Sequence, residues 1–199
     1  CLIGISTHIG DETVMATTSA QIQQLYVAYL GRAADKAGLD YWLAATNPTD
    51  TKPAALTLDD LRSNFVNEQK EYSDVYGGLS RQDTVVKIYN NLFGRAPDAA
   101  GLTYWTTGGG ATVNADQLLQ AFINGAGATD SKVVANKVLV AEVYTSTAGD
   151  NFAAADAKTI ISGVTDDNST IADALDLLTD GSLGGIAVPT GVSALKADA

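Results

Sequence analysis

The chain has 199 residues, of which 46% are hydrophobic and 18% are charged, and these proportions predict a folded globular protein. Acidic residues outnumber basic residues by 23 to 12. The resulting net charge of −11 argues against nucleic acid as a partner, because phosphate backbones repel a negative protein. No apolar run reaches the roughly 18 residues of a transmembrane helix, so the sequence predicts no transmembrane segment.

Cysteine and histidine are too scarce for the commonest catalytic and zinc sites. The single cysteine, Cys1, excludes an intramolecular disulfide and a zinc site built from several cysteines. Ser/His/Asp or Cys/His catalysis would have to use the single histidine, His8, which lies before every organised part of the chain. The sequence therefore predicts a protein that is not an enzyme and has no cofactor.

The N-terminal residues 1–16 differ in pattern from the rest of the chain and are predicted to be an extension. Cys1–Val14 alternates like a strand, whereas Met15 opens a Thr/Ser stretch that is typical of a helix start. Three interpretations stay open for this segment: an upstream extension or a misplaced start, a genuine N-terminal strand, or a mature N-terminus lipidated at Cys1. No N-terminal secretory signal is visible.

Helical periodicity begins at residue 17, and a first repeat is predicted over about residues 17–78. Its first helix is expected to run from an N-cap at Ser19 to Gly31, with one apolar face. That face consists of Ile22, Leu25, Tyr26, Tyr29 and Leu30. A later helix is expected from Thr57, its N-cap, to the stop at Gly77-Gly78.

A second repeat is predicted over about residues 79–127. Its first helix is expected to end at Gly94, and another begins at an N-cap, Asn114, and ends near Gly125. The apolar face of the first of these helices consists of Val85, Ile88, Tyr89, Leu92 and Phe93.

Further helices are predicted over about residues 128–183, and a flexible tail or linker over 184–199. One long amphipathic helix follows Asp130, and two short helices come after it, the last with Ser169 or Thr170 as its N-cap. Pro189 and Gly191 interrupt any long element in the tail. The whole pattern predicts an all-α, compact helical domain of two similar repeats and short C-terminal helices.

One motif occurs twice, as "LGRAADKAGLDYW" from Leu30 to Trp42 and as "FGRAPDAAGLTYW" from Phe93 to Trp105. The two copies are 63 positions apart throughout, and a weaker likeness joins 61–67 to 118–124. The matching positions are Gly31, Arg32, Asp35, Gly38, Tyr41 and Trp42 in the first copy and Gly94, Arg95, Asp98, Gly101, Tyr104 and Trp105 in the second.

Each residue type in the motif fits a structural role at a corner between two helices. The first glycine ends a helix at positive φ, and the aspartate is the N-cap of the short helix that comes next. The second glycine is expected where a side chain would collide with the preceding helix. The arginine either lies across an aromatic ring or donates to helix-end carbonyls, and the tryptophan points into the core.

Functional alternatives for the motif are weaker than the structural interpretation. Asp35 and Asp98 are candidate calcium ligands, but each corner supplies too few oxygen atoms for a complete site. Trp42 and Trp105 would bind sugar only if they were exposed. The three glycines of residues 108–110 lack the preceding strand and following lysine of a phosphate-binding loop, and are interpreted as a flexible connector. No set of catalytic residues is recognised.

The duplicated motif resembles the G-R-x-P-D-x-x-G-x-x-Y-W signature of domain-of-unknown-function family 4214, over about residues 17–145. The first copy departs from that signature, because Ala34 stands in place of the proline. The resemblance implies an N-terminal region of a large bacterial surface-layer, adhesin-like or repeats-in-toxin protein that is exported by type I secretion. It implies an extracellular place at the bacterial cell surface and supplies no activity.

The leading hypothesis is a non-enzymatic anchoring module of a secreted surface-layer-like protein. Its expected partners are cell-surface polysaccharide, copies of itself and calcium. The alternative is a carbohydrate-binding module of an extracellular enzyme or adhesin, and exposed tryptophans would favour it.

Overall fold

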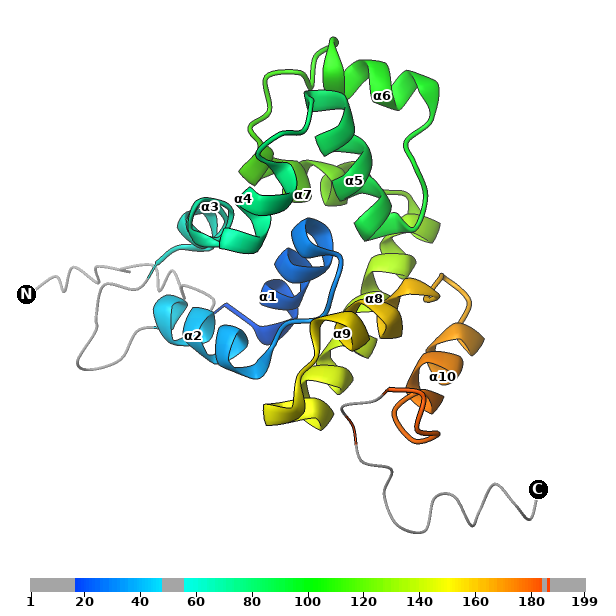
Figure 1. Ribbon diagram of the computed structural model, residues 1–199. Coiled ribbons are helices and arrows are strands. Elements are labelled where there is room, and N and C mark those ends of the chain that lie inside the picture. Colours follow the sequence, from blue (N-terminus) through cyan, green and yellow to red (C-terminus); the bar gives the residue numbers. More distant parts are fainter. Residues whose placement is uncertain (1–16, 48–55, 184–185, 187–199) are drawn as a thin grey trace, which may run out of the picture.

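All the regular elements of the described residues are helices (Figure 1). The computed structural model describes residues 17–47, 56–183 and 186, so the predicted N-terminal extension and almost all of the predicted tail lie outside the described part. The all-α prediction is confirmed. The elements are α1 Ser19–Leu25, η1 Tyr26–Leu30, α2 Lys36–Thr46, α3 Leu58–Glu68, α4 Lys70–Tyr76, α5 Arg81–Phe93, α6 Ala99–Thr106, α7 Ala115–Gly125, α8 Ala128–Ala148, η2 Gly149–Asn151, α9 Ala154–Ser162 and α10 Ser169–Asp176.

The first helix begins one residue earlier than the sequence indicates. Thr18, not Ser19, is the N-cap: its side chain accepts from the Gln21 N–H, and the Gln21 side chain accepts from the Thr18 N–H. This reciprocal capping box satisfies two backbone donors at once, which a cap at Ser19 would not do.

The last turn of this helix, η1, is a π-helix that the sequence does not predict. All five of its residues are buried, and Gly31 comes next with φ 64° and donates its N–H to the carbonyls of Tyr26 and Val27. The equivalent helix of the second copy, α5, keeps α geometry up to Gly94. The motif that follows is therefore compatible with either helix type.

The single helix predicted from Thr57 to Gly77 is two helices, α3 and α4. Thr57 is the N-cap as predicted, but Gln69 is extended, with φ −73° and ψ 108°, and separates them. Beyond this break, Tyr72 packs edge-on against Tyr29, and Glu71 binds Arg32. The helix propensity of the residues around Gln69 does not predict this break. In the structure, the residues that follow the break contact the first helix and its corner.

The sequence also predicts N-caps for two other helices, α7 and α10, and only the first of these is correct. Asn114 occupies the N-cap of α7 as predicted, although its side chain makes no capping bond there. The prediction of Ser169 or Thr170 as a cap is wrong: Asn168 is the N-cap residue of α10, and the Asp167 side chain accepts from the Ser169 N–H. An aspartate two residues upstream therefore replaces the predicted hydroxyl cap.

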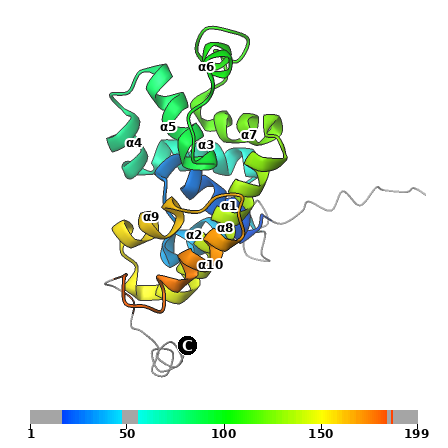
Figure 2. The same cartoon turned by 90° about the vertical axis from the view of Figure 1, so that its right-hand side faces the viewer.

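Two clusters of buried side chains form the core, and α8 contributes to both. The larger cluster joins both repeats through residues such as Leu25, Phe65 and Ile88, and α8 adds Val134 and Val138 to it. In Figure 1, α8 continues from there past α1 toward α9 and α10. The second cluster contains Val140, Ala141 and Tyr144 of α8 together with side chains of α9 and α10. Figure 2 shows α6 at the opposite end of the molecule from α10.

None of the helices in the described ranges has both the length and the apolar character needed to cross a bilayer.

Candidate functional site

The first corner, Gly31–Gly38, is built as the sequence predicts. Gly31 ends η1 in the left-handed region, and the Asp35 carboxylate accepts from the Gly38 N–H at 2.9 Å, so Asp35 is the N-cap of α2. A Cβ atom on Gly38 would lie 2.2 Å from the hydroxyl oxygen of Tyr26, a buried residue of the preceding helix. The predicted collision is confirmed here.

Arg32 is buried in this corner and lies across aromatic rings, as one of the two predicted alternatives has it; the carbonyl to which it donates belongs to the corner itself and not to a helix end. Arg32 donates to the Ala33 carbonyl at 2.9 Å and lies over the rings of Tyr26 and Phe152, at 5.1 and 4.9 Å from their centroids. Its Nε and Nη2 also donate to Glu71 of α4, at 3.1 and 2.9 Å. One arginine therefore joins the corner to α4 and to the C-terminal helices.

The second corner, Gly94–Gly101, repeats this backbone but is open to solvent. Gly94 has φ 71°, and the Asp98 carboxylate accepts from the Gly101 N–H at 2.7 Å. Arg95 is exposed; it lies over the ring of Tyr89 and binds Asp130 of α8. A Cβ atom on Gly101 would meet Asp98 and Pro97 but no atom of the preceding helix, so the predicted collision is wrong for this copy.

The aromatic pair that ends each motif has one inner and one outer ring. Trp42 is only 2% exposed, whereas Trp105 is half-buried and packs against Phe122, so the prediction of a core tryptophan is met fully in the first copy and partly in the second. Tyr41 and Tyr104 are 59% and 50% exposed. Each tyrosine stands edge-on to its tryptophan, with ring centroids 4.9 and 4.8 Å apart.

The three glycines after α6 form a packed turn and not the loose connector that the sequence predicts. Gly110 is buried, and a Cβ atom on it would lie 2.4 Å from the ring of Trp105. Arg81 donates to the carbonyls of Trp105 and Gly110, both at 3.1 Å. The absence of a side chain at Gly110 lets the backbone return closely over the tryptophan.

The candidate calcium ligands are occupied as helix caps. In the described ranges, no group of three or more His, Cys, Asp or Glu side chains is placed to hold a metal ion. Asp35 and Asp98 lie in separate corners, and each bonds a backbone N–H at the start of its own helix. Calcium binding at these residues stays a prediction.

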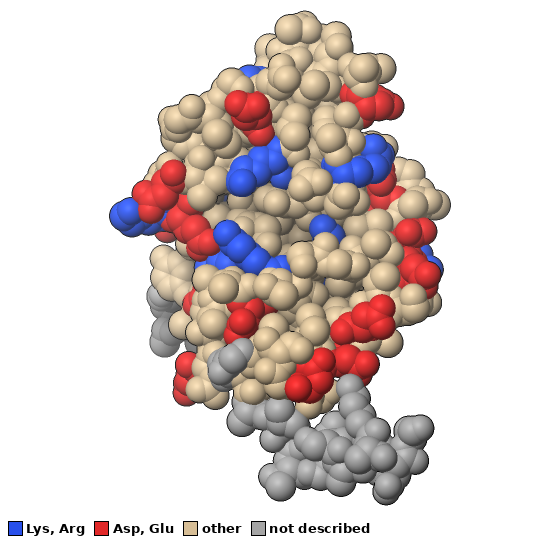
Figure 3. Space-filling model, turned by 45° about the vertical axis from the view of Figure 1, so that its right-hand side comes forward, with Lys and Arg blue, Asp and Glu red and all other residues tan. Residues whose placement is uncertain are grey.

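A cleft that the sequence does not reveal lies where η1, α4, α5, α8 and α9 meet. It consists of two adjoining cavities of about 130 and 240 Å³, which share Gly31, Asn91 and Lys158. Lys87 lines the first and Lys137 the second. Figure 3 shows this face hollowed across the middle, with Lys and Arg side chains around the hollow.

The one hint of the cleft in the sequence is Lys137, a single cation in the mostly apolar run "VVANKVLVAEV" of α8. Lys137 is 5% exposed, and its Nζ donates to the Asn91 carbonyl at 2.8 Å. Burial lowers the pKa of its ammonium group to about 8. The Asn91 amide in turn donates to the Ala28 carbonyl, which joins α5 to η1 at the floor of the cleft.

Comparison with known protein families finds one match. Residues 63–128 match the family described as a domain of unknown function, DUF4214. This segment runs from within α3 to the start of α8, so the DUF4214 segment contains the second corner, while the first corner precedes it. No curated protein and no solved structure matches the chain.

Proposed function

We propose that this chain is a non-enzymatic anchoring module of a secreted bacterial cell-surface protein and that it attaches to envelope polysaccharide. The observation that carries the proposal is the pair of exposed tyrosines, Tyr41 and Tyr104, at the same position of the two motifs. Of the matching positions of the two motifs, the tyrosine is the one whose side chain is exposed in both copies, since Arg32 and Trp42 are buried and Trp105 is half-buried.

Exposed tyrosines suit a sugar polymer because a phenol ring combines an apolar face with a hydroxyl group that exchanges hydrogen bonds. A neighbouring tryptophan holds each ring edge-on, so little side-chain freedom is lost when a ligand binds. A repeating polysaccharide can engage two such rings on one molecule, and the second contact then forms at a high effective concentration.

Extracellular placement, type I secretion and membership of a surface-layer-like protein are parts of the same proposal and rest on the family resemblance of the motif. The carbohydrate-binding alternative, a module of an extracellular enzyme or adhesin, uses the same two tyrosines. It no longer rests on the tryptophans, because Trp42 is buried and Trp105 half-buried.

The test is co-sedimentation of the chain with purified bacterial envelope polysaccharide, comparing Tyr41→Ala, Tyr104→Ala and the double variant. We expect each single variant to weaken binding and the double variant to lose at least about tenfold in affinity, as for interface aromatic anchors. Leu139→Ala is the matched control, since Leu139 is as exposed as Tyr104 but lies on α8.

Two results would count against polysaccharide attachment. One is binding by the double variant that equals binding by the parent chain. The other is tyrosine-dependent self-association in sedimentation velocity without polysaccharide, which would make these rings contacts between copies of the chain.

A further inference from the structure

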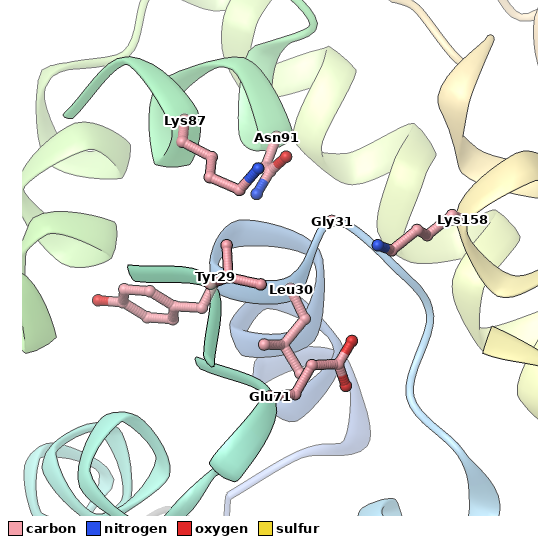
Figure 4. Close-up of a pocket in the computed structure, with 8 residues that line it drawn as sticks. Tyr29, Leu30, Gly31, Glu71, Lys87, Asn91 and Lys158 are labelled. Carbon is pink, nitrogen blue, oxygen red and sulfur yellow. The ribbon is translucent and has the colours of Figure 1, made fainter. Parts of the chain in front are cut away.

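The cleft gathers three lysines that form no ion pair within the described part of the chain. Of the six lysines in the described ranges, Lys36 and Lys70 form ion pairs with aspartates of their own helices. Lys87, Lys137 and Lys158 come from three different helices and line the cleft, and none of them forms an ion pair with a described residue. In Figure 4, Lys158 extends from α9 toward Gly31, and Lys87 lies beside Asn91 on α5.

Lys137 is the strongest indication of a ligand. A lysine is rarely buried to this degree without a carboxylate, because its charge loses the solvation of water. Its ammonium group has three donors, and in the described structure one of them is used, in the bond to the Asn91 carbonyl. Lys137 is only 5% exposed. Two of its three N–H donors therefore have no acceptor among the described residues.

Helix ends near the cleft do not balance these charges. Both η1 and α5 end here, at Gly31 and Gly94, and each helix end carries about half a negative elementary charge. Together they offset about one of the three ammonium charges. Glu71 also lines the cleft, but it binds Arg32. About two positive charges remain without compensation.

We propose that this cleft is a binding site for a phosphate group, held by Lys137 at its inner end and by Lys158 and Lys87 at its mouth. A phosphate carries nearly two negative charges at neutral pH, which matches the surplus. Lysine binds phosphate as a point charge, without the fixed fork geometry of arginine.

The size and the local field of the cleft agree with this ligand. Its two adjoining cavities, about 130 and 240 Å³, have room for a single anionic group. The net charge of −11 repels phosphate polymers at long range, but salt screens that repulsion beyond about 10 Å, and the ligand in the cleft meets the lysines first.

The test is calorimetric titration of the full chain with inorganic phosphate at pH 7 and constant ionic strength. We expect saturable binding of one phosphate, and about tenfold weaker binding in Lys158→Gln and in Lys87→Gln. Both side chains are exposed, so these variants should fold. Lys36→Gln and Lys70→Gln remove the same charge elsewhere and should bind like the parent.

A second titration, with poly(glycerol phosphate), identifies the source of the phosphate. Tighter binding per phosphate than for the free ion indicates a phosphate-bearing surface polymer, and equal or weaker binding indicates a free phosphate or small ester. In either case Lys158→Gln must weaken binding.

Absence of saturable binding by both probes would overturn the proposal. So would an equal loss in Lys36→Gln and Lys158→Gln, since this would reflect general charge. These outcomes are independent of Tyr41 and Tyr104, so polysaccharide attachment and the phosphate site can fail separately.

Discussion

Gly38 and Gly101 occupy the same position in the two corners, yet they have different neighbours. Each would place a Cβ atom 3.1 Å from the carboxylate of its own capping aspartate. Only Gly38 would also place it 2.2 Å from the hydroxyl of Tyr26, a ring held in the core. The pair therefore isolates the effect of one close approach.

We expect Gly38→Ala to lower the free energy of unfolding by about 2 kcal/mol, because the buried ring cannot move aside without disturbing its neighbours. Gly101→Ala should change it by less than about 1 kcal/mol, since the better helix propensity of alanine offsets the contact with Asp98. Urea unfolding of both variants measures the difference. Equal losses would show that Tyr26 yields easily.

Lys137 provides a prediction about pH. Its ordinary pKa of 10.5 applies in the unfolded chain, whereas in the folded chain burial lowers the pKa to about 8. Between these values the unfolded state binds more protons, so the stability that Lys137 contributes rises with pH. Below about pH 8 the buried ammonium group is charged, and its full desolvation cost lowers the free energy of unfolding.

The parent chain should therefore gain about 3 kcal/mol relative to Lys137→Met between about pH 8 and pH 10.5, in phosphate-free buffer. Taking the difference from the variant removes the titration of tyrosines, which both proteins share. Urea unfolding at steps of pH measures it. A difference that stays constant with pH would mean that the Lys137 pKa is close to its ordinary value.

Short helices such as α2 and α6 depend strongly on their caps. Asp98→Ala should destabilise the chain by about 1 kcal/mol, whereas Asp98→Asn should cost only a few tenths, because asparagine caps nearly as well as aspartate. The same pair of substitutions at Asp35 should keep this order.

Thermal unfolding with calcium and with chelator separates the two roles of the aspartates: a calcium ligand would lose its calcium response in both variants.

Helix ends that depend on local chemistry could be predicted from the sequence. Gly31 and Gly94 end their helices at positive φ, and Asp35 and Asp98 cap the next ones, because each of these roles needs only a few neighbouring residues. The break at Gln69 could not be predicted, because glutamine has no strong preference against helix and the contacts of Glu71 and Tyr72 beyond it come from distant residues.

The candidate site was even less accessible from the sequence. Lys87, Lys137 and Lys158 lie far apart along the chain and share no motif, so only the packing of α5, α8 and α9 brings them together. The tyrosines were named as part of the motif, but their exposure depends on the direction that each short helix takes over the core. The helical spacing of the motif predicts that both tryptophans lie in the core, but Trp105 is only half-buried.

For the whole molecule, α8 joins the two core clusters, and this predicts a single unfolding transition. Both tryptophans belong to or pack against the larger cluster, whereas α9 and α10 pack in the smaller one. Tryptophan fluorescence and far-ultraviolet circular dichroism should therefore give the same urea midpoint. An earlier transition seen only by circular dichroism would show that the C-terminal helices unfold separately.

The different cover of the two corners also bears on how the duplicated copies can change over time. The first corner is closed by the C-terminal helices: the Ala33 N–H donates to the Ala157 carbonyl, and Phe152 covers Arg32. The second corner has its arginine in solvent. A substitution at Arg32 would leave a buried carbonyl and the Glu71 carboxylate without their donor, whereas a substitution at Arg95 would remove an exposed cation and leave the Asp130 carboxylate without its donor. The two copies of the motif are therefore constrained by different neighbours: the first by the C-terminal helices, the second by α8.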